Sequence, residues 1–316
     1  MGKTRIAVLS YLYTVGAFCV FGFLSAQNVP YSNFLSGENT YISYCAPCHG
    51  VRGDGHSPAA RAMSPSPRDF SSGLYKFRST LSGSLPTDDD LILSISNGLP
   101  GTWMPSWKGV LSDEQIEDVT AYIKTLLNSE QKWKQSESLP SLSYNPPLAS
   151  SELLRDGRGF YLLLECWTCH GLDGKGNGPS AMALKDSKNK PIKPTNLTEK
   201  KYRAGTSVTN IRKTILTGLT GTPMPSYKDL FLLAKEDINE IEFSKDLPHS
   251  SREIFHSFVS QLPSNTELNS LTEEMITELS IRNEWALAYY VRSLIKKESW
   301  YDWLFRSNPE DVQLSE

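Results

Sequence analysis

Cys45-Ala46-Pro47-Cys48-His49 and Cys166-Trp167-Thr168-Cys169-His170 are two copies of one pentapeptide, CxxCH, placed 121 residues apart in a chain of 316. Together they use four of the five cysteines. The fifth, Cys19, lies in an apolar N-terminal stretch, so no pair of cysteines is left to form a disulfide framework.

The similarity between the two copies continues beyond these motifs. Residues 98–107, GLPGTWMPSW, correspond to residues 218–227, GLTGTPMPSY, at an offset of 120. Residues 122–126 match residues 290–294 only after about 48 additional residues in the second copy. The chain is therefore a tandem duplication with one insertion late in the second copy.

The pattern of apolar residues predicts an all-α fold. Ser112-Asp113-Glu114 opens a helix whose apolar residues recur at a spacing of three and four from Ile116 to Leu127. Elsewhere Gly, Pro and Ser are frequent, which indicates long loops and argues against a sheet. Such loops suit a small domain if they wrap a large apolar ligand that replaces part of the core.

These boundaries divide the chain into five expected parts. They are an export signal or N-terminal anchor at 1–26, a first domain at 27–128, a linker at 129–150, a second domain at 151–298 with an insertion at about 229–280, and a C-terminal tail at 299–316.

The N-terminus has the order of an export signal. Lys3 and Arg5 precede an uncharged run of 19 residues at 6–24, and small residues follow up to Ala26. The run is also long enough to span a bilayer. Two alternatives remain open, cleavage after Ala26 or retention as a membrane anchor, and both place the body in the periplasm or on the outer face of the cytoplasmic membrane.

The CxxCH spacing fits covalent attachment of haem. Two cysteines three positions apart on a helical turn can form thioethers with the two vinyl groups of a haem, and the next residue, His49 or His170, then faces the iron. Zinc is a poor alternative because each unit supplies at most three ligands. We expect two haems c, attached through Cys45 and Cys48 and through Cys166 and Cys169.

A methionine in each copy is the expected sixth ligand. Met104 lies 55 residues after His49 and Met224 lies 54 after His170, each in a Gly-Thr-x-Met-Pro-Ser turn. A thioether is a soft ligand that favours ferrous iron. With both axial positions filled by the protein, neither iron has room for a substrate, so the pattern indicates electron transfer and no enzymatic activity of the chain itself.

These motifs resemble the class I c-type cytochromes, here as a tandem di-haem protein. The resemblance covers about residues 37–128 and 157–228 and resumes at 284–295. It implies small helical domains in which the N- and C-terminal helices cross, each domain around one haem.

In this family the N-terminal helix carries a glycine and an aromatic residue before the cysteines. Gly37 and Tyr41 match that pattern in the first copy, whereas the second copy has Leu162 where Tyr41 sits. We therefore expect a shifted helix contact in the second copy.

Two arginines are candidates for pairing with haem propionates. Arg78 and Arg203 each lie in a short segment that matches between the copies, and a guanidinium suits a carboxylate through two hydrogen bonds. The alternative is that both are ordinary surface residues.

The small net charge of −3 gives no polycationic surface, which argues against nucleic-acid binding. It hides an asymmetry, because residues 155–228 hold 13 Lys/Arg and 5 Asp/Glu, whereas residues 229–316 hold 8 and 17. The acidic part either folds back on the second domain, or leaves a basic face that steers an acidic partner, or is merely solvated.

The leading hypothesis is a di-haem cytochrome that moves single electrons between exported or membrane-bound redox proteins, as a carrier or as a subunit of a respiratory oxidoreductase. Donor and acceptor are not identified by the sequence. The alternatives are a di-haem peroxidase, which needs one displaceable axial ligand, and a haem sensor, which would usually carry a signalling module.

Overall fold

The protein is helical. The computed structural model describes residues 31–128, 133–134 and 136–296, and within these ranges it contains helices and loops but, in place of strands, only the isolated bridges Lys108–Leu111 and Lys185–Pro191. The predicted all-α class is confirmed. The predicted export segment and C-terminal tail lie outside the described residues. None of the described helices is both long and apolar enough to cross a membrane.

The first helical unit begins with one nearly continuous rod. The rod consists of α1 (Tyr31–Thr40), the π-helical turn η1 (Tyr41–Cys45) and α2 (Ala46–His49). The unit continues with the 3-10 turns η2 (Ala59–Ala62) and η3 (Phe70–Ser72) and the helices α3 (Asp88–Asn97) and α4 (Asp113–Thr125). Capping boxes start α3 at Thr87 and α4 at Ser112, and the helix that the sequence predicted at Ser112 is confirmed.

The second unit repeats this order and adds three helices. It comprises α5 (Ser151–Leu163), α6 (Cys166–His170), η5 (Ala181–Ala183), α7 (Val208–Thr217) and α11 (Glu273–Ser293). Between α7 and α11 lie η6 (Lys235–Asp237), α8 (Glu240–Ser244), α9 (His249–Ser260) and α10 (Asn265–Ser270), with η4 (Pro140–Ser143) in the segment that joins the units.

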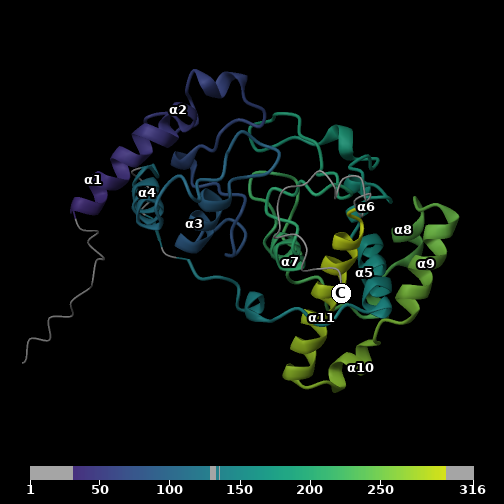
Figure 1. Ribbon diagram of the computed structural model, residues 1–316. Helices are drawn as coiled ribbons and strands as arrows, with labels where there is room; N and C mark the ends of the chain where they lie inside the picture. Colours follow the sequence, from purple (N-terminus) through teal and green to yellow (C-terminus); the bar gives the residue numbers. More distant parts are fainter. Residues whose placement is uncertain (1–30, 129–132, 135, 297–316) are drawn as a thin grey trace, which may run out of the picture.

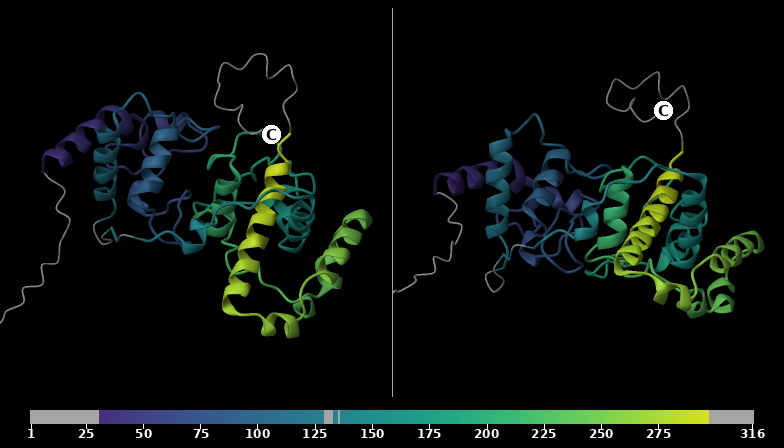
Figure 2. Two further views of the ribbon diagram at one scale, coloured as in Figure 1. Left: turned by 60° about the horizontal axis from the view of Figure 1, so that its bottom comes forward. Right: turned by 90° about the horizontal axis from the view of Figure 1, so that it is seen from below.

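The two units lie side by side, with α3 and α7 on the facing sides (Figures 1 and 2). Ion pairs cross between them, from Lys213 to Asp90 at 3.7 Å and from Lys188 to Asp69 at 3.4 Å. The joining segment also bonds to the first unit, because the Leu139 amide donates to the Ser79 carbonyl at 2.8 Å. The helices on the facing sides, α3 and α7, occupy equivalent positions in the two copies.

Each unit is held together by a close crossing of its first and last helices. A Cβ atom placed on Gly37 would lie 2.2 Å from the Asp118 carbonyl oxygen of α4. A Cβ atom on Gly157 would lie 2.0 Å from the Ala286 carbonyl oxygen of α11. Since no larger residue fits at either contact, glycine sets the distance between the helices.

The expected shift of this contact in the second copy is wrong. Tyr41 donates to the Gly50 carbonyl at 2.7 Å, and Tyr161 makes the same bond to Gly171 at 2.6 Å. Tyr161 thus takes the place of Tyr41, and the residue matched to it from the sequence, Leu162, is its neighbour. Both tyrosines are fully buried at the crossing.

The mismatch arises from one extra residue between this tyrosine and the first cysteine of the second copy. In the first copy, the tyrosine and the first cysteine are connected by the π-helical turn Tyr41–Cys45. In the second copy, the connection includes Glu165, which adopts a left-handed backbone conformation with φ of 54°. The additional residue is accommodated after the crossing, so the crossing itself is unchanged.

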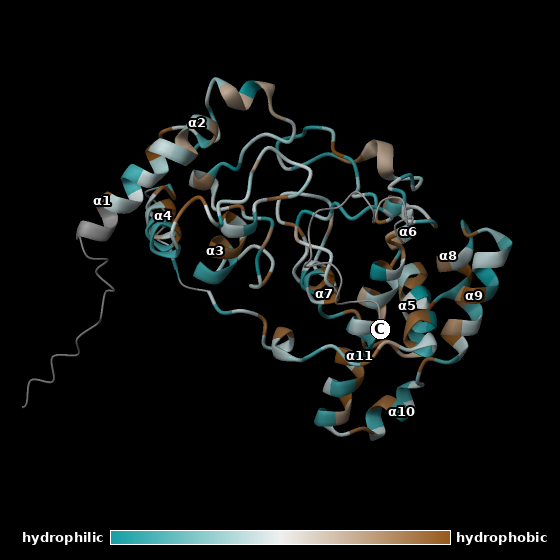
Figure 3. Cartoon of the chain, viewed as in Figure 1, coloured by the Kyte–Doolittle hydropathy of each residue, from teal (hydrophilic) through white to brown (hydrophobic). Residues whose placement is uncertain are grey.

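The insertion packs on the outer side of α5. A Cβ atom placed on Gly159 would lie 2.1 Å from a ring carbon of Phe258 in α9. The Phe258 and Phe160 rings meet edge to face, with their centroids 4.9 Å apart. Phe255 and Val259 of α9 join the same apolar core, which Figure 3 shows as brown segments around α5, α9 and α11. The apolar face of α9 is therefore part of the second unit's core.

A buried ion pair distinguishes the two cores. Arg212 of α7 bonds to Glu284 of α11 at 2.5 Å, with side chains only 1% and 5% exposed, and it also lies 4.4 Å from the Trp285 ring. At the equivalent positions of the first unit, Ile92 and Ile116 belong to an apolar cluster. The second unit therefore has a buried ion pair at positions where the first unit has apolar packing.

Replacing Gly37 or Gly157 by alanine should disrupt the crossing. A methyl group would meet a backbone carbonyl that cannot rotate away, and we expect a loss of about 3 kcal/mol in the free energy of unfolding. Guanidinium unfolding followed by circular dichroism measures it. Asn39→Ala, at an exposed position of α1, is the control, and a loss at the glycines no larger than that of the control would contradict the crossing.

The ion pair allows a double-mutant cycle that takes the first copy as its template. Arg212→Ile or Glu284→Ile alone leaves a buried unpaired charge, and each should cost about 3–5 kcal/mol of the free energy of unfolding. The double variant, which reproduces the pair Ile92 and Ile116, should recover most of that loss. Additive losses in thermal and guanidinium unfolding would show that the two side chains do not act as a pair.

Candidate functional site

Both motif histidines are held in one orientation by a backbone carbonyl. The Nδ1 atom of His49 lies 3.0 Å from the Arg68 carbonyl oxygen, and that of His170 lies 3.0 Å from the Thr195 carbonyl oxygen. A carbonyl only accepts, so Nδ1 carries the proton and Nε2 keeps its lone pair. Burial lowers the pKa of both histidines, which favours the neutral form that binds a metal.

These acceptors were missed from the sequence because a carbonyl has no residue-type signature. Arg68 and Thr195 each follow a proline, Pro67 and Pro194, and that shared neighbour is the one signal that could have found them. In the first unit Phe70 also stacks on His49, with ring centroids 4.5 Å apart. The ring is therefore fixed both in plane and in rotation.

The two cysteines of each motif lie three positions apart on one helical turn. Burial raises the pKa of Cys45 and of Cys166 to about 12 in each case. Cys45 packs against the apolar core of the first unit and Cys166 against that of the second.

The methionine turns are built in the same way in both units. The Leu99 amide donates to the Met104 carbonyl at 3.0 Å, and the Leu219 amide donates to the Met224 carbonyl at 3.1 Å. The hydroxyl of the serine two residues after each methionine donates to the preceding helix, at 2.6 Å in the first unit and 2.5 Å in the second. Each turn is thus closed on itself and tied to α3 or α7.

The structure brings each methionine to the same cluster as its cysteine. Met104 and Cys45 pack against the core of the first unit, and Met224 and Cys166 against that of the second. The sequence-predicted residues of each copy therefore gather in one half of the molecule.

The residues present fit a haem in each unit. Each unit supplies two cysteines, a histidine whose Nε2 keeps its lone pair, and a methionine that packs on an apolar core, which matches the chemistry of a covalently bound porphyrin. In the first unit the buried Tyr75 hydroxyl and Trp133 indole N–H have no partner among the described residues, although their rings meet at 5.7 Å. Such donors suit the carboxylates at a haem edge, and no sequence pattern marked either residue.

Comparison with known proteins agrees with this geometry. Residues 32–123 match the family described as cytochrome c oxidase, cbb3-type, subunit III, and residues 154–242 match the cytochrome c family. A solved chain from the Kuenenia stuttgartiensis reducing HAO-like protein complex is 34% identical, with a TM-score of 0.63 over 83% of this chain and 96% of that chain. No curated protein matches the sequence.

The chain belongs to the cytochrome c family. It has two cytochrome c domains in tandem and two covalently bound haems c, one in each domain. Electron transfer is the function that these domains indicate.

The two candidate propionate partners of this cytochrome lie in different surroundings. Arg78 is 1% exposed, and its guanidinium donates to the backbone carbonyls of Leu81, Tyr75, Thr217 and Gly218. Arg203 is exposed. Pairing of either arginine with a propionate remains a prediction, but the hydrogen bonds that Arg78 makes go to backbone atoms of both domains.

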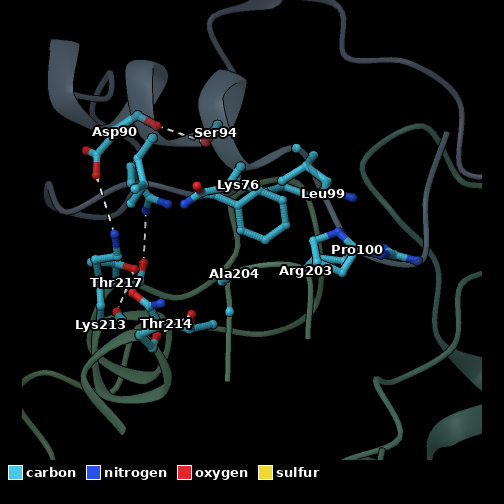
Figure 4. Close-up of a pocket in the computed structure, with 17 residues that line it drawn as sticks. Lys76, Asp90, Ser94, Leu99, Pro100, Arg203, Ala204, Lys213, Thr214 and Thr217 are labelled. Atoms are coloured by element: carbon cyan, nitrogen blue, oxygen red, sulfur yellow. Dashed lines mark hydrogen bonds and ion pairs between the residues drawn. The ribbon is translucent and has the colours of Figure 1, made fainter. Parts of the chain in front are cut away.

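A cavity of about 110 Å³ lies between the cytochrome domains. Figure 4 shows it bounded by Lys76, Leu99 and Pro100 of the first domain and by Arg203 of the second, with Asp90 and Lys213 joined across one side. It is lined by matching faces of α3 and α7.

Proposed function

We propose that this cytochrome passes single electrons between redox proteins. The iron ligands would be His49 and Met104 in the first domain and His170 and Met224 in the second. Thioethers at Cys45 and Cys48, and at Cys166 and Cys169, would hold the haems. The domains would extend over 27–128 and 151–298.

The observation that carries the proposal is the identical arrangement of the two halves. Each half contains a histidine with Nδ1 at 3.0 Å from a carbonyl, and a methionine whose turn is anchored to a helix packs on the same apolar cluster as the first cysteine of the motif. When bound, haem c supplies an iron that changes between the ferric and ferrous states. The protein's part is to fill both axial positions and to keep them filled.

A closed coordination shell favours electron transfer over turnover of a substrate. A peroxidase needs one iron with an open or displaceable position, and the two methionine turns have the same internal bonds. We therefore propose that the chain is not itself an enzyme.

A subunit of a larger oxidoreductase in a respiratory chain is favoured over a mobile carrier. The similar solved chain belongs to a protein complex, and the second domain carries helices that a minimal cytochrome domain would not need. The charged and apolar N-terminal pattern supports a location in the periplasm or on the outer face of the cytoplasmic membrane, where the N-terminal segment, if retained, would anchor the chain.

The oxidised cytochrome should show the red charge-transfer band of methionine bound to ferric haem. Met104→Ala and Met224→Ala should each remove about half of its intensity, because each removes one of two equivalent thioethers. Optical spectroscopy of the haem-loaded chain measures this. A high-spin spectrum in the unaltered protein would favour the peroxidase alternative.

A basic loop in the second domain is a candidate docking surface. Residues 185–201 contain six exposed lysines, and the same loop supplies the Thr195 carbonyl that holds His170. Positive charge around this histidine would attract an acidic redox partner and orient it toward the second haem. The lysines are Lys185, Lys188, Lys190, Lys193, Lys200 and Lys201.

Oxidation of the reduced cytochrome by ferricyanide, an anionic probe, should therefore depend on salt. Raising the ionic strength from ~0.01 to ~0.15 M shortens the Debye length from about 30 to 8 Å and should slow the reaction. Glutamine at Lys185, Lys190 and Lys193 together should weaken this dependence, whereas Lys108→Gln in the first domain should not. A rate that stays constant with salt in stopped-flow measurements would argue against the docking surface.

A further inference from the structure

The C-terminal end of α7 receives a charged donor from the other domain. Arg78 Nη2 lies 2.9 Å from the Thr217 carbonyl oxygen, and Nη1 lies 3.5 Å from that of Gly218. The same guanidinium is fixed on its own side by the carbonyls of Leu81 at 3.1 Å and Tyr75 at 3.4 Å. With 1% exposure, it is a buried cation whose hydrogen-bond acceptors are all backbone carbonyls.

This is a favourable place for a positive charge. The last carbonyls of a helix have no partner within the helix and carry the negative end of its dipole. A cation that donates to them forms charge-assisted hydrogen bonds, which are stronger than neutral ones, and inside the protein little water competes for them. Arg78 therefore stabilises the end of a helix to which it is not connected in sequence.

The Met224 turn is built directly on this helix end. A Cβ atom on Gly218, where φ is 64°, would lie 2.6 Å from the Pro225 carbonyl carbon, so the turn and the helix end are in backbone contact. The Tyr227 amide donates to the Ile215 carbonyl at 3.1 Å. Any displacement of the last residues of α7 would therefore move the methionine.

The first domain does not receive the reciprocal contact. Arg203 lines the cavity beside Asn97 and Gly98, the counterparts of Thr217 and Gly218, but it is exposed. Among the described residues, no hydrogen bond joins Arg203 to either carbonyl. Among the described residues, an arginine of the other domain therefore donates to the helix end below the Met224 turn, whereas Arg203 does not donate to the helix end below the Met104 turn.

We propose that Arg78 is a positioning residue through which the first domain holds Met224 in place at the second haem. The inference rests on the proposed ligation by Met224. Docking of the domains then makes the second iron more resistant to ligand exchange than the first, so the two haems of one duplicated domain differ in how firmly their sixth ligand is retained.

Imidazole, which competes with methionine for ferric haem, is the probe. In the full haem-loaded chain carrying Met104→Ala, the red charge-transfer band reports Met224 alone. Adding Arg78→Gln should lower the imidazole concentration that removes this band by about tenfold, as expected for loss of charge-assisted hydrogen bonds. Arg61→Gln, at an exposed position of the first domain, is the control and should leave it unchanged.

The reverse background separates a local effect from a general one. In a chain carrying Met224→Ala the band reports Met104, and Arg78→Gln should not alter its imidazole titration. Arg78→Lys, which keeps the charge but loses the paired donors, should give an intermediate shift of the Met224 band. This milder variant decides the question if Arg78→Gln does not fold, as judged by circular dichroism.

Equal imidazole titrations with and without Arg78→Gln would overturn the inference while leaving the proposed ligation intact. Equal shifts at both methionines would also overturn it, because they would indicate a general loosening of the protein. Absence of any red band in the Met104→Ala chain would instead remove the ligation by Met224 and the inference together.

Discussion

The close backbone crossing of the first and last helices is the constraint on which each half of the molecule depends. Gly37 meets the Asp118 carbonyl, and Gly157 meets that of Ala286, at distances that exclude a side chain. This approach buries Tyr41 and Tyr161, whose hydroxyls bond to the glycines that follow the two CxxCH motifs. The crossing therefore fixes where the cysteines and histidine of each domain lie relative to its core.

Around this shared frame the two copies have diverged in how they are stabilised. The first domain packs Ile92 and Ile116 where the second buries Arg212 against Glu284. Removing one partner of such a pair leaves an unpaired buried charge, which is strongly destabilising. The contact between α7 and α11 is therefore less tolerant of single substitutions than apolar packing would be. The insertion adds α9 to the outer side of α5, and Arg78 adds a contact from the first domain. The second haem site is thus the more heavily supported of the two.

Much of this was predictable from the sequence because the duplication could be seen in it. The repeated CxxCH and Met-Pro-Ser segments fixed the chemistry, and the apolar spacing after Ser112 predicted the helix α4. The role of Tyr161 was missed because one extra residue, absorbed by the left-handed Glu165, shifts any ungapped match. The acceptors of Arg78 in the second domain lie 139 or more residues away and are carbonyls, so no residue type marked them.

Electron transfer by this protein depends most directly on two haems, one held by each CxxCH motif. Pyridine haemochrome analysis combined with intact mass measurement should give two covalently attached haems c for each chain. Alanine at Cys166 and Cys169 should reduce the number to one and leave the haem at Cys45 and Cys48 in place. One or no covalent haem in the unaltered chain would contradict the account.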